Sequence, residues 1–124
     1  MNGKIRSFTD LKAWQERHQL VLIIYKVTED FPQKENFNLT LQVRRSAISI
    51  TSNIAEGFSR KSRKEKVQFY YVALGSITEL QNQLIIARDI GYLEKEKFDQ
   101  LNKQIIKVQK LINGLVKSAR ILNT

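Results

Sequence analysis

SRKEKVQFYYVALGSITELQNQLIIARDIG, residues 62–91, is the stretch with the strongest fold signal in the chain. Ser62 and Glu65 have the spacing of a capping box, in which each side chain bonds to the other residue's backbone amide at a helix start. Apolar residues then recur every three or four positions until Gly91, a residue type common just beyond a helix end. The segment predicts one long helix. Its apolar stripe is Tyr70, Ala73, Leu74, Ile77, Leu80, Leu84 and Ala87.

Three more segments have the same periodicity and predict helices over residues 10–29, 39–58 and 95–122. Phe31-Pro32 ends the first, because a residue before proline is disfavoured in the α region. The apolar face expected for the first helix is Leu11, Trp14, His18, Val21 and Tyr25. The face expected for the second is Leu39, Val43, Ala47, Ile50 and Ile54. The face expected for the last is Leu101, Ile105, Val108, Ile112, Leu115, Ala119 and Leu122.

Short connections between these helices predict an all-α fold, an antiparallel up-down-up-down four-helix bundle. At 124 residues the chain has the length of one domain, so we expect residues 1–124 to form a single bundle domain.

Two glycines have expected structural roles. Gly57 is expected to be the C-cap of the second helix, and Gly75 is expected to admit a closely packed neighbouring helix.

Residues that could carry catalysis are scarce. The chain has no cysteine, and its one histidine, His18, is expected to pack in the core or in an interface. Di-iron bundles need Glu-x-x-His pairs, and this sequence has none; a Gly-x-Ser-x-Gly elbow and a P-loop are also missing. We therefore expect no metal, no cofactor and no enzymatic activity. The longest apolar run, residues 20–25, is far below the ~20 residues that span a bilayer, so we expect a cytoplasmic protein without membrane contact.

Positive charge is concentrated in the second half of the chain. The net charge is +9, and residues 60–124 hold thirteen basic side chains against six acidic ones. Such asymmetry is typical of proteins that bind polyanions, nucleic acid before membrane. On a helical wheel, four lysines share the outer face of the last helix. They are Lys103, Lys107, Lys110 and Lys117.

A second basic group lies at the predicted turn before residue 65, where the start of the third helix also favours phosphate. Its candidate nucleic-acid-binding residues are Arg60, Lys61, Arg63, Lys64 and Lys66. The aromatic residues Phe58, Phe69 and Tyr70 flank the run and are either base-stacking or core residues. No sequence-reading motif accompanies the run, so binding through it is expected to depend on the phosphate backbone and on salt.

Four polar residues beside core positions of the helical stripes are expected to fix packing and register, namely Asn53, Glu56, Ser76 and Glu79. Of Arg44 and Arg45, one is expected to face an interface carboxylate and the other to face solvent. An alternative is that Glu56 and Glu79 form a carboxylate pair for acid–base chemistry. Apolar residues beyond those needed for one seam per helix indicate self-association. These residues are Leu20, Leu22, Ile24, Ile85 and Ile86.

Five short strings together define a family resemblance: FTDLKAW (8–14), FP (31–32), LQVRRSA (41–47), SITSNIAEG (49–57) and ALGSITEL (73–80). In this order and spacing they resemble the bacterial four-helix-bundle proteins encoded by intervening sequences in 23S ribosomal RNA genes, over residues 8–118. Thr51 stands where that family usually has proline. The resemblance implies a ring-like homopentamer with a basic surface and no established enzymatic activity. Its shared positions fall on Arg45, Asn53, Glu56, Gly57, Gly75, Ser76 and Glu79.

The accessory protein of diversity-generating retroelements is similar in fold and charge to that family, and it works with a reverse transcriptase and nucleic acid. The leading hypothesis is therefore a non-catalytic, basic, oligomeric protein that binds RNA or other nucleic acid. The first alternative is a protein-interaction scaffold with no nucleic-acid role. The second is an enzyme that uses Glu56 and Glu79.

Overall fold

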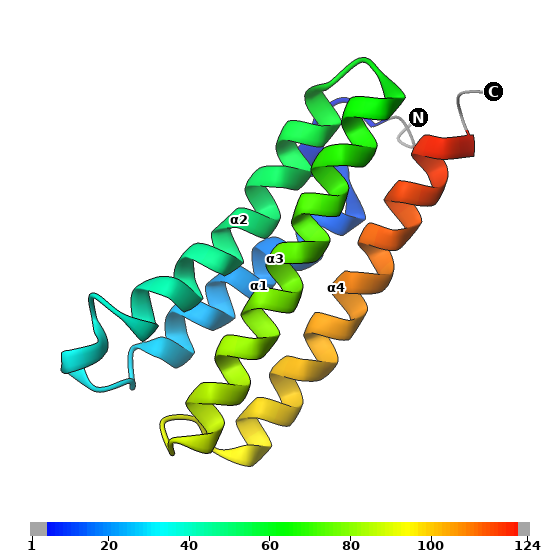
Figure 1. Cartoon of the computed structure of the whole chain (residues 1–124). Coiled ribbons are helices and arrows are strands. Elements are labelled where there is room, and N and C mark those ends of the chain that lie inside the picture. The colour runs from blue at the N-terminus through cyan, green and yellow to red at the C-terminus, as the bar shows by residue number, and fades with distance from the viewer. Residues whose placement is uncertain (1–4, 122–124) are drawn as a thin grey trace.

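The computed structural model describes residues 5–121, and four long helices dominate it (Figure 1). They are α1 (Lys12–Thr28), α2 (Leu39–Ser59), α3 (Arg63–Asp89) and α4 (Lys95–Ile121). Single 3-10 turns at Phe8–Asp10 and Gln33–Glu35 precede α1 and α2, and the described residues contain no strand. The prediction of an all-α four-helix bundle is confirmed, with the start of the first helix shifted to Lys12.

The helices pack in chain order around the bundle. α2 and α3 share the most extensive interface, and α1 contacts α4 the least among the neighbouring pairs. Within the described residues no Cα atom of α1 comes within 8 Å of a Cα atom of α3, so these two helices are diagonally opposed. The α2–α3 turn and the end of α4 lie at the same end of the bundle (Figure 1).

The core confirms the predicted stripes of α2, α3 and α4. Val43, Ile77 and Ile105 illustrate them, each at or below 1% exposure. Leu122 of the α4 seam lies outside the described residues. Burying these apolar side chains is the main source of stability, at roughly 25 cal/mol per Å² of apolar surface.

The predicted face of α1 is confirmed only in part: Leu11 is buried, and Trp14 and Val21 pack against the core. His18 and Tyr25 are exposed, and the His18 ring stacks on Trp14 at 4.8 Å between centroids. Residues 20–25 are all apolar, so periodicity alone cannot identify the inward side of this helix. The buried positions of α1 are Ala13, Arg17, Leu20, Ile24 and Thr28.

Arg17 is fully buried, which the sequence pattern did not indicate. Its Nη2 atom donates to the carbonyl oxygen of Val108 on α4 at 3.4 Å. Its Nε and Nη1 atoms have no acceptor among the described residues. Burial lowers the pKa of the Arg17 guanidinium to about 9, so the side chain is still a cation at neutral pH. The bundle therefore contains a buried charge between α1 and α4.

The ends of α3 match the sequence signals. Ser62 Oγ accepts a hydrogen bond from the Glu65 backbone amide at 3.1 Å, which is the Ser62 half of the predicted capping box. Gly91 has a φ of +91°, and the amides of Gly91 and Tyr92 donate to the carbonyls of Arg88 and Ala87. This is a Schellman motif, which satisfies the last carbonyls of the helix.

The two predicted glycine roles are both wrong. An added Cβ at Gly75 would meet no atom within 4 Å, so no helix packs closely there. Gly57 lies inside α2 and is buried, and the C-cap is Arg60. A Cβ at Gly57 would lie 2.6 Å from Cε1 of the Tyr70 ring and 3.1 Å from Cβ of Phe69. Gly57 is therefore the position at which α3 approaches α2 closely.

A matched pair of substitutions tests this assignment. Gly57→Ala and Gly75→Ala gain the same helix propensity, about 1 kcal/mol. Only the Gly57 variant also crowds a buried ring, at an overpacking cost of about 1–3 kcal/mol. Urea unfolding should therefore find Gly57→Ala less stable than Gly75→Ala by about 1–3 kcal/mol. Equal stabilities would mean that Tyr70 moves aside freely, contrary to its burial.

Candidate nucleic-acid interface

All four lysines of the predicted α4 stripe are exposed, on the side of the helix opposite its buried seam. From Lys103 to Lys117 they extend over fifteen residues, which is about 21 Å along the axis at 1.5 Å per step. No acidic residue of the sequence follows Asp99, so α4 beyond that point has only positive charges.

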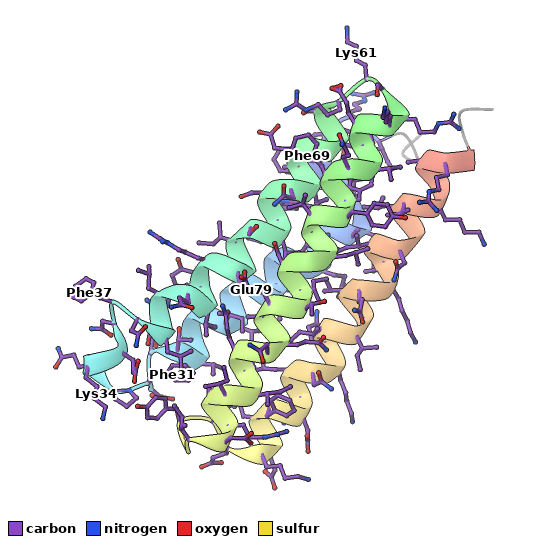
Figure 2. All side chains as sticks on the ribbon, in the orientation of Figure 1. Phe31, Lys34, Phe37, Lys61, Phe69 and Glu79 are labelled. Atoms are coloured by element: carbon purple, nitrogen blue, oxygen red, sulfur yellow. The ribbon has the colours of Figure 1, made fainter. Side chains whose placement is uncertain are left out.

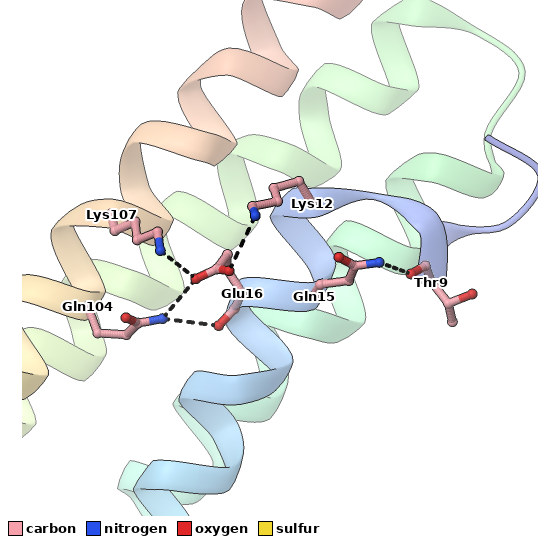
Figure 3. Close-up of polar contacts among 6 residues, drawn as sticks. All are labelled: Thr9, Lys12, Gln15, Glu16, Gln104 and Lys107. Carbon is pink, nitrogen blue, oxygen red and sulfur yellow. Dashed lines mark hydrogen bonds and ion pairs between the residues drawn. The ribbon is translucent and has the colours of Figure 1, made fainter. Parts of the chain in front are cut away.

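Lys107 differs from the other three because it forms an ion pair. Its Nζ atom lies 3.0 Å from Oε1 of Glu16 on α1. Glu16 also lies 3.9 Å from Lys12 and accepts from Gln104 at 3.4 Å, so three side chains converge on one carboxylate (Figure 3). The Lys107 hydrogen bond is the main cause that holds the Glu16 pKa below its usual range.

Sequence reasoning missed this contact, because Glu16 and Lys107 are far apart in the chain. Lys103, Lys110 and Lys117 make no hydrogen bond or ion pair with the described residues. These three are the free cations of the stripe.

The cations of the basic run at the α2–α3 turn differ in the contacts that they make. Arg60 pairs with Glu56 at 3.1 Å, and its guanidinium lies 4.8 Å from the centre of the Phe69 ring. Lys66 donates to the carbonyls of Gly57 and Phe58 at 3.3 and 2.8 Å, and its burial lowers the Lys66 pKa. Arg60 and Lys66 therefore stabilise the end of α2, where carbonyls lack helix partners.

Of the other three cations of the run, Lys61 and Lys64 are exposed and Arg63 is half-buried. Lys61 lies at the tip of the turn and points away from the bundle (Figure 2), and Lys64 is also exposed. Arg63 Nη1 donates to the backbone carbonyl of Arg120 near the end of α4. The turn and the α4 stripe, which sequence analysis treated separately, therefore converge at one end of the bundle. Arg120 is a basic residue of this end that sequence reasoning did not select.

The aromatic residues that flank the run are mostly inaccessible. Tyr70 is buried, and burial raises its pKa. Phe58 and Phe69 are half-buried, with Lys66 and Arg60 over their rings. The exposed aromatic residue at this end is Tyr71, whose hydroxyl accepts a hydrogen bond from Arg120.

The polar residues of α2 and α3 form a hydrogen-bonded seam between these helices. Ser46 donates to Glu79 at 3.0 Å, and the hydroxyls of Ser49 and Ser76 lie 2.8 Å apart. Asn53 donates to the Ser49 carbonyl at 2.8 Å. The Ser46–Glu79 and Ser49–Ser76 bonds cross between the helices and favour one register, whereas the Asn53 bond lies within α2.

Two of the predicted polar residues lie outside the seam. Arg45 is exposed and makes no hydrogen bond within the described residues. The interpretation of Glu56 and Glu79 as an acid–base pair is wrong. Glu79 faces Ser46, and Glu56 lies ten residues further along α2, roughly 15 Å away at 1.5 Å per residue. Glu56 pairs with Arg60 instead.

Residues 5–121 contain no group of three or more histidine, aspartate or glutamate side chains that could hold a metal ion. In the same part of the chain, no helix is long and apolar enough to cross a membrane.

Comparisons with known proteins agree with the fold. A family model described as 23S rRNA-intervening sequence protein matches residues 9–114. Among solved structures, the chain is similar to a crystal structure of a protein of unknown function from the S23 ribosomal protein family of Bacteroides thetaiotaomicron. The two are 22% identical with a TM-score of 0.75, and the match covers 85% of this chain and 98% of the other. At that identity the likeness shows the fold alone. No curated protein matches the chain.

Proposed function

Because the chain belongs to the 23S rRNA-intervening sequence protein family, we propose that it is a non-catalytic, cytoplasmic, basic oligomer that binds nucleic acid, RNA first. The observation that carries this proposal is the line of free lysines Lys103, Lys110 and Lys117, on a helix that has no acidic residue of its own after Asp99. Lys61 and Lys64 extend the same charge onto the α2–α3 turn.

The ligand chemistry follows from these residue types. Lysine is a flexible point charge suited to phosphate, and none of the three α4 lysines is held in a geometry that would read a base edge. At 3.4 Å per phosphate along one strand, the ~21 Å stripe is as long as roughly six phosphates. Binding is therefore driven by counterion release and is weakly selective for sequence.

Self-association is the second part of the proposal. Leu22 on α1 and Ile85 and Ile86 on α3 are exposed, as expected from the surplus of apolar residues. Leu20 and Ile24 are fully buried and belong to the core instead. Because α1 and α3 are diagonally opposed, the two exposed apolar sets lie on different sides of the bundle. Two unlike patches suit head-to-tail contacts, which close into a ring, and we propose the homopentamer that the family resemblance implies.

The test is a salt titration of binding to a structured RNA and a matched duplex DNA, with light scattering in the same buffer. We expect log affinity to fall linearly with log salt, with a slope of about −3 or steeper from four or more phosphate contacts. We also expect one assembly of fixed size. A monomer at every concentration would contradict the ring, and affinity that is independent of salt would contradict the phosphate-binding face.

The alternative function is a protein-interaction scaffold. It is favoured by a groove of about 430 Å³ between α1 and α4, with Ile23, Val27 and Leu101 in its lining. If no nucleic acid binds even at low salt, and a protein partner persists after nuclease treatment, the scaffold becomes the leading function.

A further inference from the structure

We infer that a depression between the start of α3 and the end of α4 binds one unpaired nucleotide of a single strand. This inference rests on the nucleic-acid binding proposed above and assigns it a specific pocket. The depression has a volume of about 360 Å³, within the range of small-ligand sites. It is lined by Arg63, Lys64, Val67, Gln68, Tyr71 and Arg120.

The stacking surface consists of Tyr71 and Arg120. Tyr71 is 46% exposed, whereas its neighbour Tyr70 is 3% exposed. The Arg120 guanidinium lies 5.4 Å from the centre of the Tyr71 ring, and its Nη2 atom donates to the Tyr71 hydroxyl. The Arg120 guanidinium therefore lies over one face of the Tyr71 ring, and the hydrogen bond ties it to that ring. Aromatic rings and arginine guanidinium planes are the two protein surfaces on which unpaired bases stack.

The cations around the depression bind the phosphate of the same nucleotide. Arg63, Lys64 and Arg120 contribute three positive charges, against the single carboxylate of Glu65 in the first turn of α3. The α3 N-terminus adds the positive end of the helix dipole. An apolar wall with a cationic rim fits a nucleotide, which combines a flat base with a phosphate.

The position of the depression connects it to the proposed phosphate-binding face. Lys117 precedes Arg120 by three residues, which is about 4.5 Å along α4. A strand that follows the lysines of α4 therefore reaches the depression at the end of the stripe. A base in a duplex is already stacked and paired, and it cannot offer its face to Tyr71 without leaving the stack. The expected ligand is consequently a single strand.

Fluorescence anisotropy with a short single-stranded RNA, and with the duplex it forms with its complement, tests the inference. Tyr71→Ala should weaken single-strand affinity about 5- to 150-fold, the range of one base–aromatic stack, and change duplex affinity less than about twofold. Tyr71→Phe keeps the ring and loses only the hydroxyl that bonds to Arg120, so it should weaken single-strand affinity far less than Tyr71→Ala does. The same pair of probes in DNA form shows whether the nucleotide is a ribonucleotide. A strand with 2-aminopurine should lose emission on binding to wild type and to Tyr71→Phe, but not to Tyr71→Ala.

Each remaining outcome has a definite meaning. Equal weakening of both probes by Tyr71→Ala would overturn the inference, because the pocket would then hold only phosphate. No effect on either probe would overturn it too, and would leave the α4 face intact as the binding surface. Absence of binding by the wild-type protein would instead remove the proposed function itself.

Discussion

Changing Lys103, Lys110 and Lys117 together to glutamine is expected to weaken RNA affinity about 100-fold near 0.1 M salt. Each phosphate contact contributes a slope of about −0.7 for a single strand, so three lost contacts reduce the slope by about 2. At 0.1 M salt this is about two powers of ten in affinity. The side chains are exposed and have no partners among the described residues, so circular dichroism should show an unchanged fold. Lys107 is left in place because it bonds to Glu16.

The matched control removes the same charge elsewhere. Lys26 near the end of α1, Lys34 between α1 and α2, and Lys97 near the start of α4 are also exposed. These segments lie at the opposite end of the bundle from the α2–α3 turn (Figure 1). Their triple glutamine variant should bind nearly as the wild type does. Glu16→Gln is expected to change RNA affinity in the opposite direction. It removes the carboxylate that pairs with Lys107, so RNA affinity should increase. If both triple variants weaken binding equally, net charge and not the α4 face is responsible.

Arg17→Met is expected to stabilise the bundle by about 1–4 kcal/mol. Replacement of a buried charge by an apolar side chain of similar volume commonly has that effect. Arg17 is a strong candidate because its single hydrogen bond is long, at 3.4 Å, and two of its nitrogen atoms have no acceptor among the described residues. Urea unfolding measures the difference in free energy of unfolding between Arg17→Met and the wild type. Arg45→Met is the control. Arg45 is exposed and lies on α2, so its replacement should change stability by less than about 0.5 kcal/mol.

The pH dependence of the stability difference between Arg17→Met and wild type tests whether the buried charge is the cause. The pKa of Arg17 is about 9 in the folded protein and higher in the unfolded chain. Between those values the unfolded chain binds more protons, so the stability of the wild type rises with pH there. Well below the folded pKa of about 9, both states are protonated and the destabilisation is complete. The stability gap between Arg17→Met and wild type should therefore be constant from pH 6 to 8 and narrow above pH 9. A destabilised Arg17→Met variant would show that the buried cation has a favourable role in the fold.

Much of the fold could be predicted because the ends of long amphipathic helices have recognisable signals in the sequence. Ser62, Gly91 and Pro32 mark helix ends through local backbone chemistry, and all three signals agree with the observed ends. The candidate interface was predicted less well. Periodicity correctly predicted that the α4 lysines are exposed. It could not show that Lys66 and Arg60 bond to the end of α2. Those contacts depend on how the α2–α3 turn folds back.

The sequence by itself determined the helices, the inward faces of α2, α3 and α4, and the concentration of positive charge after residue 59. These are local properties, because propensity, capping and periodicity act over a few residues. The tertiary structure alone decided which side of α1 is buried, that Arg17 is enclosed, and that Gly57 and not Gly75 meets α3 closely. It also brought Glu16 to Lys107, and Arg63 and Tyr71 to Arg120. These pairings join residues far apart in the chain, and only the docking of one helix against another defines their distances.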